Sequence, residues 1–168
     1  LHGVPLGVKD IFAARGLPMR CGSPIHADRV ASFDAGSVAL ARAAGAVIMG
    51  KTETTEFATY KPTRTRNPHD SARTPGGSSS GSAAGAAAGM MPLAFGSQTA
   101  GSVVRPASYC GVVGFKPSHA LIESGGVAPL SRSFDTVGVF TQSVEDAAYA
   151  TGALTGLDLS PDAGAAPR

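Results

Sequence analysis

Residues 75–106 are the part of this chain that most constrains its fold. A Gly/Ser segment, PGGSSSGS, opens the stretch, a run of almost only Ala and Gly follows, and a second Gly/Ser segment, GSQTAGS, lies near its end. A flexible linker would not be interrupted by such an Ala-rich run, and an exposed helix would carry charged residues. We therefore predict a buried helix over residues 82–90, with hydroxyl groups at both of its ends.

The remaining segments predict an α/β fold with a mixed, mainly parallel central sheet flanked by helices. The apolar segments 46–49 and 112–115 are expected to be buried strands. We expect Asp34 to cap one helix and Gly45 to end it, and Ser143 to cap another. Thr52 is expected to cap one or two helical turns within residues 52–59. Further strands are expected over residues 1–12, 92–98 and 134–140, and further helices over 104–109 and from 141 onward.

Composition narrows the classes of function. The length of 168 residues suggests one domain, with a flexible Gly/Pro/Asp-containing tail at 156–168. A net charge of +2 does not suggest direct binding of nucleic acid or an anionic membrane, and no apolar run could span a bilayer. Cys21 and Cys110 lack metal-type spacing and fit a reducing cytoplasm. Four basic residues within 61–75 could contact an acidic group, although a solvated loop is the commoner situation.

Four interpretations of the Gly/Ser segments can be compared. A phosphate-binding loop requires GxxxxGK[ST] and a dinucleotide fingerprint requires GxGxxG after a strand, and neither segment has these spacings. Residues 77–81 fit the GxSxG pattern with Ser79 at its centre, but they follow a polar loop instead of a buried strand. The fourth interpretation, that Gly and Ser lie where backbones cross closely, explains either segment alone better than it explains both.

Several ordered blocks of this sequence resemble the amidase signature family. GGSSSGSAA at residues 76–84 matches the family's first serine block, and AGS at 100–102 with the following PA, CG, VG and KP pairs matches the second. The spacing between Ser78 and Ser102 is that of the two family serines. The segment GVPLGVKD matches the family strand that bears a lysine, here Lys9. With PLSRSFDTVG and SVEDAA, the resemblance covers residues 1–155, as the core of a longer amidase domain.

The resemblance implies hydrolysis of a carboxylic amide by a Ser–Ser–Lys triad. Ser102 would be the nucleophile, Ser78 the proton relay and Lys9 the base, and the Gly77–Ser78 peptide bond would be cis. The chemistry is physically reasonable, because a Ser hydroxyl needs a base to remove its proton. A lysine can be that base only when it is neutral, which burial favours by lowering its pKa.

The resemblance also implies the surroundings of the reaction. Backbone N–H groups of the turn before the nucleophile, at Thr99, Ala100 and Gly101, would bind the oxyanion. Ser79 and Gly77 would support the relay loop. The implied substrate is a small-molecule amide, no metal or organic cofactor is implied, and the protein could form a homodimer.

Two departures from the family pattern stand out. The family often has Asp before and Arg after the nucleophile, where this chain has Gln98 and Val104, with Arg105 one position later. Because both members of a charge pair are replaced together, we interpret the change as a neutral substitution. The loop at 118–124 also lacks the family's Gly and Arg.

Two alternative functions remain open at this point. One is the glutamine-hydrolysing A-type subunit of a tRNA-dependent amidotransferase. The other is an inactive, truncated amidase core, since family members are much longer than this chain.

Overall fold

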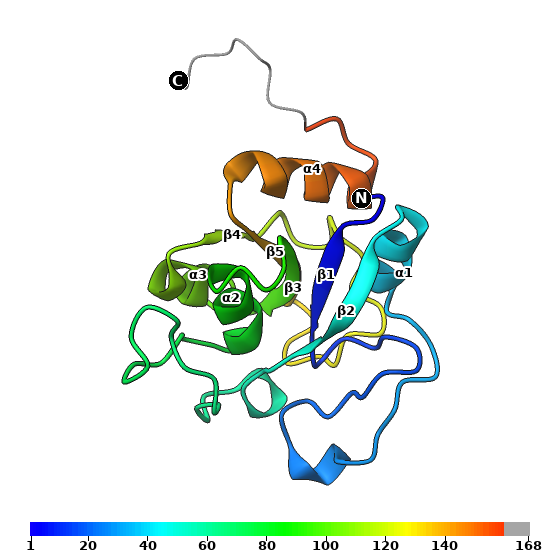
Figure 1. Cartoon of the computed structure of the whole chain (residues 1–168). Coiled ribbons are helices and arrows are strands. Elements are labelled where there is room, and N and C mark those ends of the chain that lie inside the picture. Colours follow the sequence, from blue (N-terminus) through cyan, green and yellow to red (C-terminus); the bar gives the residue numbers. More distant parts are fainter. Residues whose placement is uncertain (160–168) are drawn as a thin grey trace.

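The computed structural model describes residues 1–159, which form a five-stranded sheet with helices on both faces (Figure 1). The sheet order is β2-β1-β3-β5-β4. β1 pairs in parallel with β2 and β3, whereas β5 is antiparallel to β3 and β4, so all strands except β5 point the same way. The predicted mixed sheet is confirmed. The strands are β1 (Pro5–Lys9), β2 (Val47–Thr52), β3 (Leu93–Gln98), β4 (Val113–Phe115) and β5 (Thr136–Thr141).

The α-helices pack in pairs on opposite faces of the sheet (Figure 1). Apolar side chains of α1 (Gly36–Ala43) and α4 (Val144–Thr155) belong to the larger core, and those of α2 (Ser80–Ala87) and α3 (Val104–Cys110) to the smaller one. Because side chains alternate along a strand, β3 contributes to both cores: Leu93 and Phe95 to the larger, Ala94 to the smaller. Short 3₁₀ turns span Pro24–His26 and Glu56–Ala58.

Helix α2 is buried because its side chains are small. Most of its residues are buried, which confirms the expected buried helix, although the helix starts and ends slightly earlier than predicted. Gly81 is required where the helix passes β2, since a Cβ atom there would lie 2.4 Å from the backbone nitrogen of Glu53. Small residues therefore let this helix approach the end of the neighbouring strand.

Strands β2 and β4 form the two edges of the sheet, which corrects the expectation that both are buried. Val47 and Met49 of β2 are 54% and 56% exposed, and Phe115 of β4 is 40% exposed. A short apolar run does not show how many neighbours a strand has, so composition alone could not separate an edge strand from a central one.

Two of the expected helix ends are confirmed. Ser143 caps α4, and its Oγ accepts a hydrogen bond from the backbone N–H of Asp146 at 3.0 Å. Gly45 follows α1 with a φ of 87°, a conformation that favours glycine.

The other two expected caps are wrong. The carboxylate of Asp34 accepts the N–H of Arg15 and pairs with Arg42, so Ala35 occupies the cap position of α1 without a side-chain bond. Thr52 belongs to β2, and the following 3₁₀ turn begins after Thr55. The tertiary contacts of Asp34 and the greater length of the strand that contains Thr52 explain why neither residue caps a helix as its local pattern predicted.

The described chain ends shortly after α4. Residues 156–159 have no regular structure, and Leu157 and Leu159 pack beside Gly152. The rest of the predicted tail, 160–168, lies outside the described residues, so its flexibility and the division of the chain at residue 155 stay predictions.

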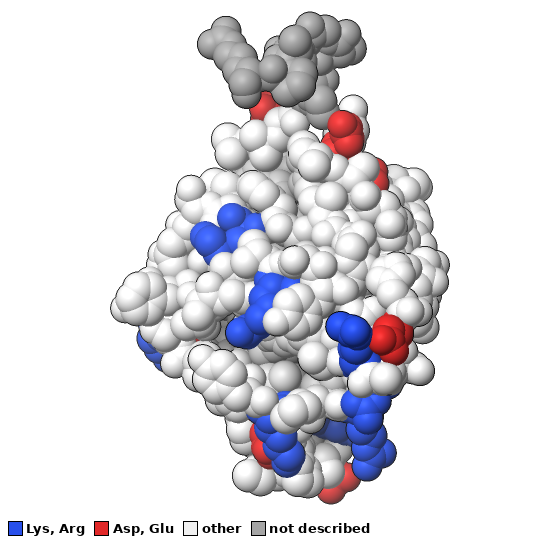
Figure 2. All heavy atoms as spheres, turned by 90° about the vertical axis from the view of Figure 1, so that its left-hand side faces the viewer, with Lys and Arg blue, Asp and Glu red and all other residues white. Residues whose placement is uncertain are grey.

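Surface charge is dispersed on the face that carries α2 and α3. Figure 2 shows basic side chains in separate groups with uncharged surface between them. Within the basic loop at 61–75, Lys61 pairs with Glu56 and Arg73 with Asp70. These pairs favour a solvated loop over an anion-binding one. Within residues 1–159, no helix is long and apolar enough to cross a membrane.

Candidate active site

Lys9, at the end of β1, lies at the centre of a buried group of hydroxyls. Its side chain is fully buried, and its Nζ donates to Ser78 Oγ at 2.7 Å and to Ser97 Oγ at 2.9 Å. Burial lowers the pKa of Lys9 from 10.5 to about 7, and the negative charge of Asp135 opposes this shift. Lys9 is therefore able to act as a neutral amine near neutral pH, which a solvated lysine is not.

The register of the sheet decides which way Lys9 points. Lys9 pairs with Thr52 of β2, and Val8 pairs with Lys51. Neighbouring residues of a strand face opposite sides. Thr52 Oγ1 lies 2.6 Å from Ser82 Oγ of α2, so this face of the sheet is the one that α2 covers. A register shift of one residue would turn Lys9 away from the serines.

Ser78 stands in the loop that leads into α2 and is 1% exposed. The Gly77–Ser78 peptide bond is cis, as predicted. The carbonyl of Ser78 accepts the N–H of Thr55 at 3.1 Å, and the hydroxyl of Ser80 donates to the carbonyl of Gly76 at 2.7 Å. Bonds on both sides therefore hold Ser78 in place beside Lys9.

Ser79 is buried against β3. Its Oγ lies 3.4 Å from both the backbone nitrogen and the carbonyl oxygen of Ser97. Gly96 makes this approach possible, because a Cβ atom there would lie 2.8 Å from Ser79 Oγ. These contacts match a residue that supports the loop. They do not match a GxSxG nucleophile, whose hydroxyl must be exposed.

Ser102 lies in the turn between β3 and α3 and is partly exposed. Gln98, the last residue of β3, accepts the N–H groups of Val103 at 2.9 Å and Val104 at 3.0 Å through its Oε1 atom. Gln98 thus satisfies two N–H groups at the start of α3 and fixes the turn that carries Ser102. The neutral residue at this position anchors the turn by hydrogen bonds alone.

The turn also presents unused hydrogen-bonding groups. Within residues 1–159, neither Ala100 nor Ser102 makes a hydrogen bond, so their N–H groups and the Ser102 hydroxyl are available to an external ligand. Unpaired N–H groups of this kind can bind a developing oxyanion. The structure brings Lys9 and Ser78 together, but it does not join Ser102 to them by a hydrogen bond.

Arg105 connects the two serine-bearing segments. Its Nε and Nη2 atoms donate to the carbonyl of Gly77 at 3.2 and 3.0 Å. A Cβ atom on Gly76 would lie 3.0 Å from Pro106 Cα, which shows how closely the loop that bears Ser78 packs against α3. The loop before Ser78 therefore rests on the helix that begins two residues after Ser102.

Two residues of this region were not predicted from the sequence. Ser97 contacts Lys9 directly, and Asp135 accepts a hydrogen bond from Thr99 Oγ1 at 2.5 Å. Both line a cavity of about 430 Å³. The only signal for Ser97 was a polar residue on an otherwise apolar strand, and Asp135 stands in the PLSRSFDTVG block, whose similarity assigned it no role. Within residues 1–159, no cluster of His, Cys, Asp and Glu could hold a metal ion.

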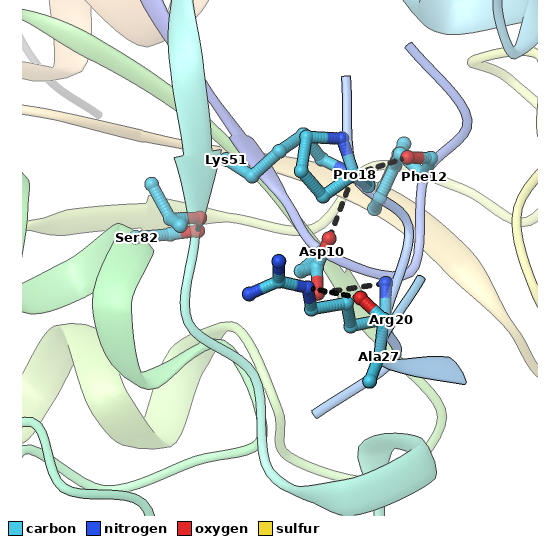
Figure 3. Close-up of polar contacts among 8 residues, drawn as sticks. Asp10, Phe12, Pro18, Arg20, Ala27, Lys51 and Ser82 are labelled. Atoms are coloured by element: carbon cyan, nitrogen blue, oxygen red, sulfur yellow. Dashed lines mark hydrogen bonds and ion pairs between the residues drawn. The ribbon is translucent and has the colours of Figure 1, made fainter. Parts of the chain in front are cut away.

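A second lysine, the partly buried Lys51 of β2, does not contact these hydroxyls. Its Nζ donates to Asp10 Oδ1 at 3.0 Å and to the carbonyls of Phe12 at 2.7 Å and Pro18 at 2.8 Å. Figure 3 shows these partners on one side of β2 and Ser82 on the other. Burial also lowers the pKa of Lys51, but the charge and hydrogen bond of Asp10 counteract that shift.

Comparison with known proteins identifies the family. A family model described as Amidase matches residues 1–165. Over 164 residues the chain is 46% identical to the A-type subunit of the glutamyl-tRNA(Gln) amidotransferase of Acidothermus cellulolyticus, a match that covers 94% of this chain and 32% of that protein. The chain belongs to the amidase signature family. Proteins named as amidotransferase subunits and as a peptide amidase are among its relatives.

Solved structures share the fold of this amidase-family chain. The native peptide amidase from Stenotrophomonas maltophilia has a TM-score of 0.88 at 39% identity, covering 94% of this chain and 34% of that one. The A-type subunit of the Thermotoga maritima glutamyl-tRNA(Gln) amidotransferase has a TM-score of 0.87 at 38% identity, covering 97% and 39%. The chain thus spans about a third of the length of these relatives.

Proposed function

We propose that this chain carries the catalytic centre of an amidase that hydrolyses a carboxylic amide through an acyl-serine intermediate. Ser102 is the nucleophile, Ser78 the relay and Lys9 the base. The observation that carries the proposal is the 2.7 Å contact between Lys9 Nζ and Ser78 Oγ, made by a lysine whose pKa burial lowers to about 7. A buried amine bonded to a hydroxyl has the properties of a general base.

The proposed steps need no reactant besides the amide and water. Ser102 Oγ attacks the amide carbonyl carbon while its proton passes to Ser78 Oγ, and the Ser78 proton passes to Lys9 Nζ. When the C–N bond breaks, Ser78 gives a proton to the leaving nitrogen and recovers one from Lys9. Water then attacks the acyl-serine by the same route and releases the acid. The backbone N–H groups of Thr99, Ala100 and Gly101 would bind the oxyanion in both halves.

Burial increases from the nucleophile to the base, which supports these roles. Ser102 is partly exposed, Ser78 is 1% exposed and Lys9 is fully buried. A substrate needs access to the nucleophile only. Exclusion of water keeps the pKa of the base low, because contact with water would restore its ordinary pKa.

A second candidate is hydrolysis of glutamine as the A-type subunit of an amidotransferase. It is favoured by the identity of 42–46% to A-type subunits of glutamyl-tRNA(Gln) amidotransferase. Both candidates use the same acyl-serine chemistry and differ in substrate and in the fate of ammonia. Glutaminase activity that requires a co-purifying partner and tRNA would identify this second function, and partner-independent hydrolysis of other amides would identify the first.

Labelling with a fluorophosphonate probe tests the nucleophile. The chain is expected to react once, at Ser102, and Ser102→Ala is expected to remove the label while the fold survives. Ser108→Ala, which changes an exposed serine of α3, is the matched control and should label like the unchanged chain. Labelling that persists in Ser102→Ala would refute the assignment. A chain that does not label, beside a protein of the relatives' full length that does, would indicate an inactive core.

Other features of the protein stay predictions. They are a small-molecule amide substrate, a homodimer, a cytoplasmic location and the lack of direct contact with nucleic acid or membrane. Components of multi-subunit enzymes are among the relatives, so size-exclusion chromatography with light scattering is the direct measurement of assembly.

A further inference from the structure

We propose that Asp135 is a positioning residue of this site: its carboxylate holds the Ser102 turn through Thr99, and its charge favours the ammonium form that Lys9 adopts during the reaction. This inference rests on the proposed function, because it assigns Asp135 a role in the same acyl transfer.

The carboxylate of Asp135 is bonded on both oxygens. Oδ1 accepts the hydroxyl of Thr99 at 2.5 Å. Oδ2 accepts the backbone N–H groups of Leu130 at 2.7 Å and Ser131 at 2.9 Å. Hydrogen bonds to a charged acceptor are stronger than neutral ones. The side chain therefore clamps the turn that follows β3 to the loop that precedes β5.

The sheet places this clamp next to the catalytic group. Asp135 directly precedes β5, whose first residue Thr136 pairs with Gln98 of β3. Gln98 is the residue that anchors the start of α3, so Thr99 lies between two anchored points. Loss of the Thr99 bond would loosen the turn while the Gln98 bonds remain.

Asp135 also acts on Lys9 electrostatically. Asp135 lines the same cavity as Ser97, whose hydroxyl contacts Lys9 Nζ at 2.9 Å, and its negative charge raises the pKa of Lys9 against the effect of burial. When Lys9 takes up the proton of Ser78, a positive charge appears in a buried site, and a carboxylate in range lowers its energy.

The other charged groups around Lys9 either bind other residues or line the cavity. Asp10 and Lys51 bind each other, and Arg105 binds the Gly77 carbonyl. Glu53 accepts hydrogen bonds from Thr65. Glu123 accepts the N–H of Gly125, and it lines the cavity together with Arg132. The side chains that contact Lys9 directly are those of Ser78 and Ser97, and Asp135 is the acidic group whose charge bears on Lys9.

Titration of the lysines by NMR separates this role from a structural one. The sequence has four lysines, so a chain labelled with ¹³C at lysine Cε gives few signals. In Asp135→Asn, the midpoint of Lys9 is expected to fall below its value of about 7 in the unchanged chain. Asp28→Asn removes an exposed charge and should leave the midpoint unchanged. An unchanged Lys9 midpoint in Asp135→Asn would overturn the electrostatic part of the proposal.

Variants of Thr99 test the clamp without altering the charge. Thr99→Val removes the hydroxyl and is expected to slow fluorophosphonate labelling of Ser102 by at least about tenfold, because small displacements of a reacting group are costly. The Lys9 midpoint should stay where it is. Thr99→Ser retains the hydroxyl and should restore most of the lost rate. Equal labelling rates in Thr99→Val and the unchanged chain would overturn the clamp, and this comparison remains possible if Asp135→Asn does not fold.

The outcomes also separate this inference from the proposed function. If Ser102 labels normally but neither the Lys9 midpoint nor the Thr99→Val rate changes, the role of Asp135 is wrong and the amidase assignment stands. If Ser102 never labels but Asp135→Asn still lowers the Lys9 midpoint, the electrostatic coupling stands and the function is wrong.

Discussion

Lys9 and Lys51 lie on neighbouring strands and are both withdrawn from water, yet their partners differ in kind. Lys51 donates to a carboxylate oxygen and two backbone carbonyls, all of which can only accept hydrogen bonds. Lys9 donates at 2.7 and 2.9 Å to two serine hydroxyls, which can donate as well as accept, and only at 3.5 Å to a backbone carbonyl, that of Ser97. Acceptors with negative charge keep an ammonium protonated, whereas hydroxyls tolerate either protonation state.

The difference indicates which of the two lysines is suited to act as a base. Burial lowers the pKa of both side chains, but for Lys51 the adjacent Asp10 counteracts it through its charge and a hydrogen bond. The charge that opposes burial at Lys9 is that of Asp135, which is not hydrogen-bonded to it. We infer that Lys51 is a structural cation and Lys9 a catalytic amine, and each of the following experiments tests this contrast.

The largest expected effect is the loss of acyl transfer in Lys9→Met. Removal of a general base typically costs about 10²–10⁴-fold in rate, and the residual rate should rise with pH as solvent base replaces the amine. Lys51→Met, measured under conditions where it is folded, is the matched control and should retain most of the rate per folded molecule. A near-normal, pH-independent rate in Lys9→Met would exclude Lys9 as the base.

For the free energy of unfolding, the loss is expected in Lys51→Met. Lys51→Met leaves Asp10 partly buried without its cation, and breaking such a pair is expected to lower the free energy of unfolding by about 3 kcal/mol. The double variant Lys51→Met/Asp10→Asn removes the unpaired charge and should lose less. Urea unfolding followed by circular dichroism measures both. Equal losses in the single and double variants would show that the ion pair itself is unimportant.

Per pH unit, a smaller effect is expected in the pH dependence of stability. Above pH 7, Lys9 is neutral in the folded chain but protonated in the unfolded chain up to its ordinary pKa of 10.5. The unfolded state then binds more protons, so the free energy of unfolding rises with pH, by up to about tenfold in the equilibrium constant per pH unit. Lys9→Met lacks this contribution, whereas that of Lys51 is common to both proteins. Parallel stability curves between about pH 7 and 10 would contradict the lowered pKa of Lys9.

The smallest effect is expected for Ser97→Ala. It removes one hydroxyl from Lys9 but leaves the Ser78 contact, so the rate of Ser102 labelling should fall by about tenfold or less. Ser37→Ala is the matched control, since Ser37 is a buried serine of α1 whose hydroxyl has no hydrogen-bond partner among the described residues. A loss as large as that of Lys9→Met would mean that Ser97, and not Ser78, is the main partner of the amine.

The sequence predicted the mixed α/β fold, the buried small-residue helix and the cis Gly77–Ser78 bond, because these depend on local composition or on motifs shared with a family. It did not predict which strands lie at the edges, since Val47 and Met49 look like core residues until their neighbours are known. It also missed Ser97, whose contact with Lys9 spans 88 positions of the chain. The contrast between Lys9 and Lys51 arises from strand register, which the sequence pattern of two apolar segments does not determine.

The most direct test of the central claim is a single NMR titration of the Cε-labelled lysines in the unchanged chain, with Lys9→Met and Lys51→Met used to assign their signals. We predict that Lys9 titrates near pH 7 and that Lys51 remains protonated to higher pH. A Lys9 signal that stays protonated above about pH 9, or a Lys51 that loses its proton before Lys9, would contradict the assignment of base and structural cation.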